Sequence, residues 1–486
     1  MPSEAQCDEQ GALLLVAGQW QNGVAAFPVL DKYHGNVIGR AQRASQAQVA
    51  AAVAAAAESF VRQPLAPYRR FQILQRASEL IESRRRELVA TIVAEAGFPI
   101  ADAENEVTRA VQTFLTSAEE AKRLVGELVP LAGAPGAAHR MGFTLRVPRG
   151  VVCGITSFNS PLNMVAHKVA PALAAGNTVV IKPPQATPLS AARLMEILID
   201  AGLPPTHASL VQGPGAEVGA WLAADPRIAF YAFTGSTAVG QGLRQAVGMR
   251  PIALELGSLS PTVVCDDADI ARAVPRCLNS GFRRAGQACT SIQRLYVQRG
   301  IQERFLEALL AAARQLKVGD PHDPATAVGP MISEAEARRA EEWVEAAVAA
   351  GARRLCGGAR RGALLPPTIL ADVPAGERVI CEEIFAPVMS VLPFDDLGRV
   401  IADMNALPYG LAAGIFTRRI DRAMDLARKL RVAVVHINES SSSRVDMMPF
   451  GGVKASGIGW EGPKYAMREM TEERLITLSL SEEEAT

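Results

Sequence analysis

The sequence has no excess of charge of either sign. Its 486 residues include 50 Lys and Arg against 50 Asp and Glu, so the formal net charge is zero. A chain without a basic surplus lacks the field that attracts nucleic acid, and we expect no nucleic-acid partner. Apolar residues account for 49% and charged residues for 21%. This composition is typical of folded proteins, with roughly one domain-sized unit per 150 residues.

Long hydrophobic runs are also missing. The best stretch, residues 164–181, carries His167 and Lys168 and does not reach the roughly 18 apolar residues that a membrane helix needs. The first ten residues, MPSEAQCDEQ, are acidic rather than basic, unlike a secretory signal. We therefore expect a cytoplasmic location and no membrane partner.

Sequence motifs for disulfides and metals are absent. The seven cysteines include no CxxC pair, and the six histidines form neither HxxxH nor HExxH. An odd cysteine count without such spacing disfavours a disulfide framework and a structural zinc site. We expect a reduced protein without a bound metal.

The pattern of the chain changes near residue 150. The first 125 residues are expected to be mainly helical, over 46–62 with Ser45 as cap, over 68–96 and over 103–124. From Val151 onward, short apolar strands alternate with helices, which predicts a parallel α/β sheet with right-handed crossovers. The predicted strands are 151–156, 177–182, 208–212, 228–234 and 251–256, with helices over 164–175, 188–201, 215–224 and 237–247 between them. A second alternating region covers 261–433.

Three residues have side chains suited to covalent chemistry. Cys289, in FRRAGQACTS, follows a helix in a small, polar context, where a thiolate could act as nucleophile; a buried, inert thiol is the alternative. Glu255 lies in an apolar strand, where burial raises a carboxyl pKa toward that of a general base, or where an ion pair holds the charge. Asn159, in SFNSPLN, could donate its amide to an oxyanion or hold a turn before a proline.

Two segments have features of a ligand site. In FTGSTAVG, residues 233–240, a strand gives way to a helix at Gly235 and Ser236, and free N–H groups at a helix start suit phosphate. Such turns also occur in many α/β proteins without a ligand. Lys182 ends an apolar strand, where open α/β sheets bind ligands or simply expose a lysine.

Seven segments occur in one order along the chain: SFNSPLN, IKPPQATP, FTGSTAVG, LELGS, FRRAGQAC, EEIFAPV and PFGGVKASGIG. With them the sequence resembles the aldehyde dehydrogenase superfamily over nearly its whole length. The 34 positions between Glu255 and Cys289 fit the layout of that family. The segments around Cys289 and Arg444 are most similar to those of lactaldehyde and phosphonoacetaldehyde dehydrogenases.

The resemblance implies NAD(P)-dependent oxidation of an aldehyde to a carboxylate, with NAD or NADP as cofactor. Cys289 would be the nucleophile, Asn159 would hold the oxyanion together with the backbone N–H of the nucleophile, and Glu255 would activate the hydrolytic water. Because Glu255 is present, hydrolysis is favoured over transfer to coenzyme A. A coenzyme A-acylating enzyme and a non-catalytic nucleotide-binding protein are the alternatives.

The resemblance also implies a set of cofactor contacts. Lys182 and Gln185 would lie at the adenosine ribose, Ser236 at the pyrophosphate, Glu383 at the nicotinamide ribose and Phe385 beside the ring. The remaining implied contacts are Thr156, Ser157, Gly215 and Gly235.

The family fold implies a Rossmann-like dinucleotide domain from 1–124 and 149–257 and an α/β catalytic domain over 258–446. An oligomerisation element would combine 125–148 with 447–486. Its strands GFTLRV and RLITLSL would be exposed apolar edges in a monomer, so we expect a homodimer or homotetramer.

The sequence departs from the family pattern in several places. Ser258 replaces a usual glycine beside Glu255, which puts the local backbone in question. Gln185 stands where NAD-preferring members often have Glu, so NADP use is expected. Ala386 replaces a common glycine. Ser157 and Ser160 replace bulkier residues, which indicates a roomier or more polar tunnel.

Several arginines are candidates for binding an acidic aldehyde, because a guanidinium binds phosphonate, sulfonate or carboxylate through a planar fork of donors. We expect Arg109 and Arg444 to contact the substrate. Arg283 and Arg284 are expected on a helix, where both could not face the tunnel. Surface or interdomain ion pairs are the alternative for all four.

Overall fold

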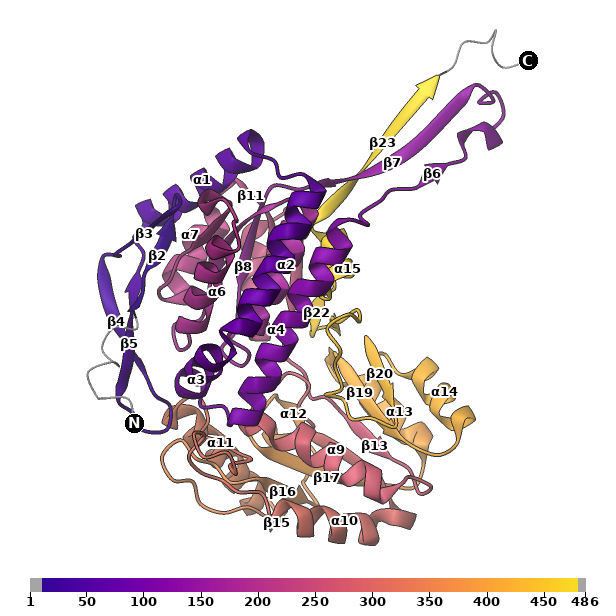
Figure 1. The fold of residues 1–486 in the computed structure, drawn as a ribbon. Coiled ribbons are helices and arrows are strands. Elements are labelled where there is room, and N and C mark those ends of the chain that lie inside the picture. Colours follow the sequence, from indigo (N-terminus) through magenta and orange to yellow (C-terminus); the bar gives the residue numbers. More distant parts are fainter. Residues whose placement is uncertain (1–10, 480–486) are drawn as a thin grey trace.

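The computed structural model describes residues 11–479, and a mostly parallel eight-stranded sheet forms the upper half of the molecule in Figure 1. Its strands follow the order β22-β12-β11-β8-β9-β10-β2-β3. The predicted strands from this half of the chain are confirmed: they are β8 (Val151–Ile155), β9 (Thr178–Lys182), β10 (Ala208–Leu210), β11 (Ile228–Thr234) and β12 (Ile252–Glu255). An α/β fold is therefore present.

Both faces of this sheet are covered by helices. Along β11, Phe230 and Ala232 belong to one hydrophobic cluster, and Tyr231 and Phe233 belong to another on the opposite face. Successive strand residues point to opposite faces, so a strand buried on both sides is an uninterrupted apolar run. This explains why these strands could be read from the sequence.

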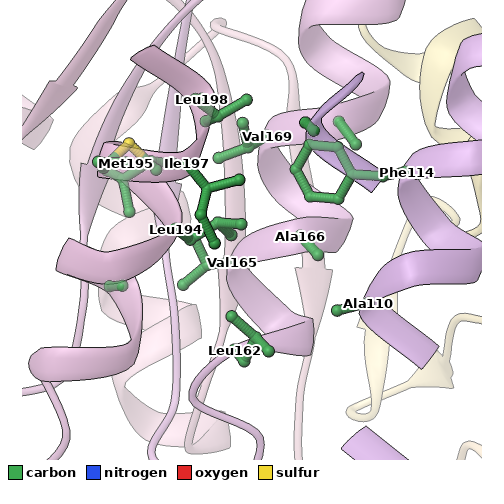
Figure 2. Close-up of a cluster of buried hydrophobic side chains, with 14 of the residues drawn as sticks. Ala110, Phe114, Leu162, Val165, Ala166, Val169, Leu194, Met195, Ile197 and Leu198 are labelled. Atoms are coloured by element: carbon green, nitrogen blue, oxygen red, sulfur yellow. The ribbon is translucent and has the colours of Figure 1, made fainter. Parts of the chain in front are cut away.

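Helix α5 (Asn163–Ala175) fills the space between α4 (Ile100–Ala121) and α6 (Leu189–Asp200). Figure 2 shows Phe114 of α4 on one side of α5, and Leu194 and Leu198 of α6 on the other. All thirteen residues of α5 are buried, including His167 and Lys168. This packing fixes the loop between β8 and α5.

The first part of the chain contains more strand than expected. Residues 11–43 form β1 (Gly11–Ala12), β2 (Leu14–Val16), β3 (Gln19–Gln21), β4 (Ala25–Leu30) and β5 (Val37–Arg43). Helices begin only at α1 (Gln46–Arg62), where Ser45 and Gln48 form a capping box, as the Ser45 cap predicts.

The other N-terminal helices differ in detail from expectation. The single helix predicted over 68–96 is wrong, because two helices, α2 (Pro67–Ser83) and α3 (Arg85–Ala96), meet at Arg84. The predicted helix over 215–224 is a π-helical turn, Gly215–Gly219, followed by α7 (Ala220–Ala224). Helix α8 (Thr237–Val247) has its predicted bounds.

A seven-stranded sheet forms the other half, in the order β15-β16-β17-β14-β13-β19-β20. Its strands are β13 (Thr262–Val264), β14 (Arg294–Gln298), β15 (Arg353–Cys356), β16 (Thr368–Ala371), β17 (Val388–Phe394), β19 (Ala412–Phe416) and β20 (Val434–Ile437). The helices of this half are α9 (Ile270–Phe282), α10 (Arg299–Ala313), α11 (Glu334–Ala349), α12 (Arg378–Cys381), α13 (Leu397–Ala406) and α14 (Ile420–Lys429).

A three-stranded arm projects from the body in Figure 1. It consists of β6 (Leu128–Val129), β7 (Arg140–Pro148) and β23 (Thr471–Ser479), with β7 and β23 antiparallel along their whole length. The two predicted strands therefore pair with each other, and position 480 of the second lies outside the described residues. Exposed apolar side chains on the arm are Leu128, Met141, Leu145, Leu475 and Leu478.

The remaining short elements connect the parts. Strands β18 (Tyr409–Gly410) and β21 (Val453–Lys454) pair with each other, and α15 (Pro463–Glu469) precedes β23. Strand β22 (Gly457–Ile458) pairs with β12 at the edge of the eight-stranded sheet. Among residues 11–479, no helix is both long and apolar enough to cross a membrane.

Candidate active site

The C-terminal ends of the parallel strands gather the predicted functional residues. Strand β8 leads into the Asn159 loop, β9 ends at Lys182, and β12 ends at Glu255. Ligands of open α/β sheets bind outside these ends of the strands. The order of the sheet thus brings together motifs that are far apart in the sequence.

One cavity of about 310 Å³ contains the three predicted catalytic residues. It is lined by Ser157, Phe158, Asn159, Thr234, Gly235, Ser236, Glu255, Leu256, Gly257, Cys289, Arg339, Glu383 and Phe385. Five predicted cofactor residues are in this lining. The cavity joins the end of the eight-stranded sheet to loops of the second half.

Cys289 lies in a loop between α9 and β14, as the loop-like context predicts. The loop turns sharply at Gly286, where φ is +70° and a Cβ would lie 2.0 Å from the Ala386 carbonyl oxygen, so only glycine fits. The Ser260 hydroxyl donates to the carbonyl oxygen of Cys289 at 2.6 Å. Within residues 11–479 the Cys289 N–H donates to no protein group, so it is available to a ligand.

Glu255 is a buried carboxylate that faces Cys289. Its side chain is 3% exposed, and neither oxygen has a hydrogen-bond partner in the described part of the chain. Burial raises the pKa of Glu255, and the nearby Glu461 carboxylate adds to this rise. Burial, and then the facing Glu255, also raise the pKa of the Cys289 thiol. A carboxylate so placed can accept a proton from the thiol or from a water beside it.

Asn159 is held by contacts to both its side chain and its backbone. The Ser157 hydroxyl donates to Asn159 Oδ1 at 2.7 Å, which orients the amide and leaves its NH₂ group without a partner among the described residues. Arg284 Nη1 donates to the Asn159 carbonyl oxygen at 2.7 Å. Arg284 is itself paired with the buried Glu106, whose other oxygen accepts the Leu162 N–H at 2.8 Å. Together these contacts fix the amide at the cavity.

The C-terminal ends of the parallel strands in the eight-stranded sheet have features that fit an anionic nucleotide. Ser236 precedes the first turn of α8 without a side-chain cap, so the N–H groups of that turn are available. The buried Thr156 Oγ1 has no partner within residues 11–479. Lys182 Nζ donates to the Pro183 carbonyl oxygen at 3.0 Å, and burial lowers the Lys182 pKa to about 8. A polar ligand would satisfy these groups.

Glu383 and Phe385 lie at the opposite wall of the cavity. The Ser258 N–H donates to Glu383 Oε1 at 2.9 Å, and burial raises the pKa of Glu383 to about 7. Ser258 is not in the left-handed region, so the serine in place of the usual glycine does not strain the backbone beside Glu255. The rings of Phe158 and Phe385 pack edge to face at 5.9 Å.

Four predicted cofactor residues lie outside the cavity lining. Thr156 and Lys182 are buried at neighbouring strand ends, where the Thr156 N–H donates to the Lys182 carbonyl oxygen at 3.2 Å. Gln185 is exposed in the loop after β9, and Gly215 is exposed at the start of the π-helical turn after β10. The nucleotide-binding role of these four residues stays a prediction.

The two arginines predicted to contact the substrate are occupied by carboxylates. Arg109 donates to both oxygens of Asp446, at 2.7 and 3.1 Å, and Arg444 donates to Glu461 at 2.9 Å. Both side chains are largely buried. Asp446 also forms a hydrogen bond with His167, and Glu461 also accepts one from Lys168; both His167 and Lys168 lie on α5.

Arg283 and Arg284 lie in a short 3₁₀ segment, Arg283–Gly286, whose backbone is non-helical at Arg284, so the prediction of a regular helix through both residues is wrong. Helix α9 ends at Phe282, and Arg284 has a φ of +52°. Arg284 is engaged with Asn159 and Glu106, whereas Arg283 Nη2 bonds only the Ser442 hydroxyl, at 2.7 Å. Within the described residues Arg283 has no ion-pair partner and its Nε has no hydrogen bond.

Five residues of the cavity lining were not predicted as site residues: Phe158, Thr234, Leu256, Gly257 and Arg339. Arg339 of α11 donates to the Ile384 carbonyl oxygen at 2.8 Å, and its charge opposes the rise in the pKa of Glu383. Phe158 stands between two noted residues of SFNSPLN and could have been included with them. Arg339 is in a charged helix, EAEARRAEEW, and nothing in that pattern distinguishes it from its neighbours.

Several known proteins resemble this chain over nearly its whole length. The chain is 43% identical to 3-sulfolactaldehyde dehydrogenase of Priestia aryabhattai over 99% of this chain and 100% of that protein. The crystal structure of aldehyde dehydrogenase 21 from Physcomitrella patens with the product succinate has a TM-score of 0.94 at 36% identity, over 96% of this chain and 98% of that one.

A second solved structure is the NADP complex of NADP-dependent glyceraldehyde-3-phosphate dehydrogenase from Bacillus halodurans. It has a TM-score of 0.93 at 34% identity, over 97% of this chain and 100% of that one. Residues 20–476 match the model of the aldehyde dehydrogenase family. The chain belongs to the aldehyde dehydrogenase family.

Proposed function

We propose that this protein oxidises a small anionic aldehyde to its carboxylate with NAD(P)⁺, using Cys289, Asn159 and Glu255. The observation that carries the proposal is the convergence of these three residues on one cavity, where both buried Glu255 oxygens, the Asn159 NH₂ group and the Cys289 N–H have no hydrogen-bond partner within residues 11–479. Buried polar groups are normally satisfied, so a cluster of unsatisfied ones indicates groups kept available for a ligand.

Cys289 acts as the nucleophile. Its thiol transfers a proton to Glu255 or to water, and the thiolate sulfur bonds to the aldehyde carbon. The carbonyl oxygen becomes an oxyanion that receives hydrogen bonds from the Asn159 amide and the Cys289 N–H. Both donors are fixed before the substrate arrives, because Ser157 and Arg284 hold Asn159 and Ser260 holds the Cys289 carbonyl.

Glu255 acts in the second half of the reaction. NAD(P)⁺, when bound, supplies the hydride acceptor that turns the adduct into a thioester. Glu255 then removes a proton from water, the water oxygen bonds to the thioester carbon, and the C–S bond breaks to release the carboxylate and the thiol. Its raised pKa suits a group that must accept this proton near neutral pH.

The proposed cofactor site lies at the C-terminal ends of the parallel strands in the eight-stranded sheet. Thr156, Lys182 and Ser236 would meet the nucleotide and its phosphates, and Glu383 and Phe385 would meet the nicotinamide riboside. We also propose cofactor contacts for Ser157, Gln185, Gly215 and Gly235. The neutral Gln185 does not repel a 2′-phosphate, which supports use of NADP as well as NAD. We also propose the predicted division into a cofactor domain, a catalytic domain and a bridging element, which the two large sheets and the arm support.

The substrate's acidic group is proposed to bind Arg283. Ser442, its hydroxyl partner, also contacts the Thr290 hydroxyl at 2.8 Å, so the guanidinium lies close to the chain that carries Cys289. Burial lowers the Arg283 pKa to about 10, which leaves it charged at neutral pH. The relatives named above are a 3-sulfolactaldehyde dehydrogenase, an aldehyde dehydrogenase with its product succinate, and a glyceraldehyde-3-phosphate dehydrogenase. The compound in each name has an acidic group. Arg109 and Arg444, with their carboxylate partners, are the weaker candidates.

The test compares aldehydes of one size with and without a charge. Sulfolactaldehyde, succinic semialdehyde and butyraldehyde would be assayed with wild type, Arg283→Met and Arg109→Met. We expect Arg283→Met to raise the KM for the two anions by at least about tenfold and to leave that of butyraldehyde within twofold. A wild-type preference for butyraldehyde would refute the substrate class. An equal effect of Arg283→Met on all three aldehydes would refute only the role of Arg283.

A homodimer or homotetramer is proposed on the basis of the arm. Its strands β6 and β23 are open edges, and exposed leucines lie along it, a surface that a second subunit would cover. Light scattering at micromolar concentration should give two or four times 51.6 kDa. The mass of a single chain would refute the proposal.

A further inference from the structure

Two histidines and two aspartates meet on the surface far from the catalytic cavity. His34 and Asp31 belong to the turn between β4 and β5, and His322 and Asp320 belong to the loop after α10. The imidazole rings are 5.4 Å apart, and the Asp31 carboxylate lies beneath them, 5% exposed. The two histidines are about half exposed.

The spacing of the donor atoms fits a metal ion. One ligand atom each from Asp31, His34 and His322 lie within 4.8 Å of one another. His34 Nδ1 is 3.3 Å from Asp31 Oδ1, and His322 Nε2 is 3.6 Å from Asp31 Oδ2. The edge of a tetrahedron around zinc, with bonds of about 2.0–2.1 Å, is about 3.3–3.4 Å. The two contacts to Asp31, one to each of its oxygens, are close to this length, and the three ligand atoms would move closer together to bind an ion.

The surroundings of these three residues support the same role. Asp31 Oδ1 accepts the N–H groups of Tyr33 and His34, at 2.8 and 2.7 Å, which fixes the carboxylate. Asp320 Oδ1 lies 2.9 Å from His322 Nδ1 and so can orient the other ring nitrogen toward Asp31. Carboxylates bound to the outer nitrogen of a histidine are typical of metal sites.

The charge balance also favours a cation. Across residues 11–479, neither Asp31 nor Asp320 forms an ion pair with a lysine or an arginine; their only such partners are His34 and His322. The neighbouring Lys32 amine donates instead to the Leu30 carbonyl oxygen at 3.0 Å. Two carboxylates without a lysine or arginine partner carry negative charge that a divalent ion would neutralise.

We propose that Asp31, His34 and His322 bind a divalent transition-metal ion of the zinc class, with Asp320 as the carboxylate that orients His322. Imidazole and carboxylate together suit zinc, cobalt or nickel better than magnesium or calcium. The ion would join the β4–β5 turn to the loop after α10. It would thereby connect the N-terminal sheet β1-β5-β4 to the half of the molecule that contains the seven-stranded sheet. Its role is structural, because none of these residues lines the catalytic cavity.

The test uses the full chain freed of metal by chelation. Cobalt chloride and zinc chloride would be titrated into wild type, His34→Ala, His322→Ala and the control His139→Ala, with calorimetry for stoichiometry and cobalt absorption for ligand type. All four proteins keep their cysteines, so binding to thiols is the same in each. We expect wild type and the control to bind one more equivalent of metal ion per chain than the two variants. The cobalt bound as that additional equivalent should show no thiolate-to-cobalt absorption band.

Two further measurements separate a built site from weak adsorption. Asp320→Asn should bind the same equivalent about 10–100-fold more weakly. Added zinc should raise the melting temperature of wild type and the control, but not of His34→Ala. Equal stoichiometry and affinity in all variants, or no bound equivalent in wild type, would overturn the proposal and leave the cluster as an ion-pair network.

Discussion

Two charged regions adjoin Cys289, and they differ in how well their polar atoms are satisfied. On one side, the Glu255 oxygens, the Asn159 NH₂ group and the Cys289 N–H have no partners among the described residues. On the other side, Arg109 with Asp446 and Arg444 with Glu461 form buried ion pairs. Residue type suggested function in both regions, but in the second region the charge of each arginine is already balanced by a carboxylate, although Arg444 Nε has no hydrogen-bond partner among the described residues.

The difference teaches how to judge a charged residue near an active site. An arginine with a carboxylate partner already has its charge balanced, and its removal leaves an unbalanced buried charge. A donor or acceptor left without a partner is costly unless a substrate completes it. The predictions below test whether this distinction holds.

Cys289→Ala should have the largest effect on the first region. Without the sulfur no covalent adduct forms, so steady-state aldehyde oxidation should fall by more than about 10⁴-fold. NAD(P) binding, measured by fluorescence quenching, should change little, because Cys289 is not among the residues proposed to bind the cofactor. Retained turnover would remove Cys289 from the mechanism.

Glu255→Gln should slow turnover by about 10²–10⁴-fold, because only thioester hydrolysis needs the base in every cycle. Rapid mixing should then show a burst of reduced cofactor followed by slow turnover. Preincubation at high pH, which ionises the thiol, checks whether adduct formation itself is intact. If the burst disappears at every pH while thioester hydrolysis is normal, the assignment of Glu255 to the second step is wrong.

Arg444→Met should test the second region through stability. It leaves the buried Glu461 with one cation, Lys168, and breaking a buried pair costs about 3–5 kcal/mol. Arg283→Met removes only a bond to a hydroxyl and should cost about 1 kcal/mol. Denaturation midpoints at one protein concentration compare them. Equal losses in the two variants would mean that ion-pair partners do not distinguish these arginines.

The pH dependence of cofactor affinity should show the smallest effect. Burial raises the Glu383 pKa to about 7, so its carboxylate gains charge, and can accept from ribose hydroxyls, as pH rises through 7. Burial lowers the Lys182 pKa to about 8, so its positive charge is lost as pH rises beyond 8. NADP affinity should therefore be greatest between these values, with changes of up to about tenfold per pH unit. Calorimetric Kd values check this.

Glu383→Gln supplies the control for that profile. It should remove the dependence below pH 7 and keep the decline above pH 8. A profile unchanged by this variant would exclude Glu383 from cofactor binding.

The parallel strands and most of the cavity could be predicted from the sequence because the evidence for them is local. Strands β8 to β12 are apolar runs bounded by polar or glycine-rich segments, and their ends agree to within two residues. Motif order then placed Asn159, Glu255 and Cys289 in one site. Most of the predicted residues in the cavity come from segments at the ends of these strands or from the Cys289 loop, whereas Glu383 and Phe385 come from the segment between α12 and β17.

The remaining features depend on partners that are distant in sequence. Asp446 is 337 positions from Arg109, so no local pattern could reveal their pairing. The helix break at Arg84 has no glycine or proline to mark it. The left-handed backbone at Arg284 is stabilised by Glu106 and Asn159, contacts that form only in the folded protein. The histidine cluster joins positions 34 and 322, which a search for spaced motifs cannot find.

The pairing of β22 with β12 has a consequence for how the enzyme is made. The ribosome completes β12 and its Glu255 about 200 residues before it reaches Gly457, the strand partner of Glu255, and then Glu461, the neighbour that raises its pKa. During this interval the edge of β12 is an unpaired strand, open to wrong partners or to a chaperone. The surroundings of the proposed catalytic base are therefore completed late in synthesis, and a nascent chain that stops before residue 457 contains Cys289 but lacks the finished surroundings of Glu255.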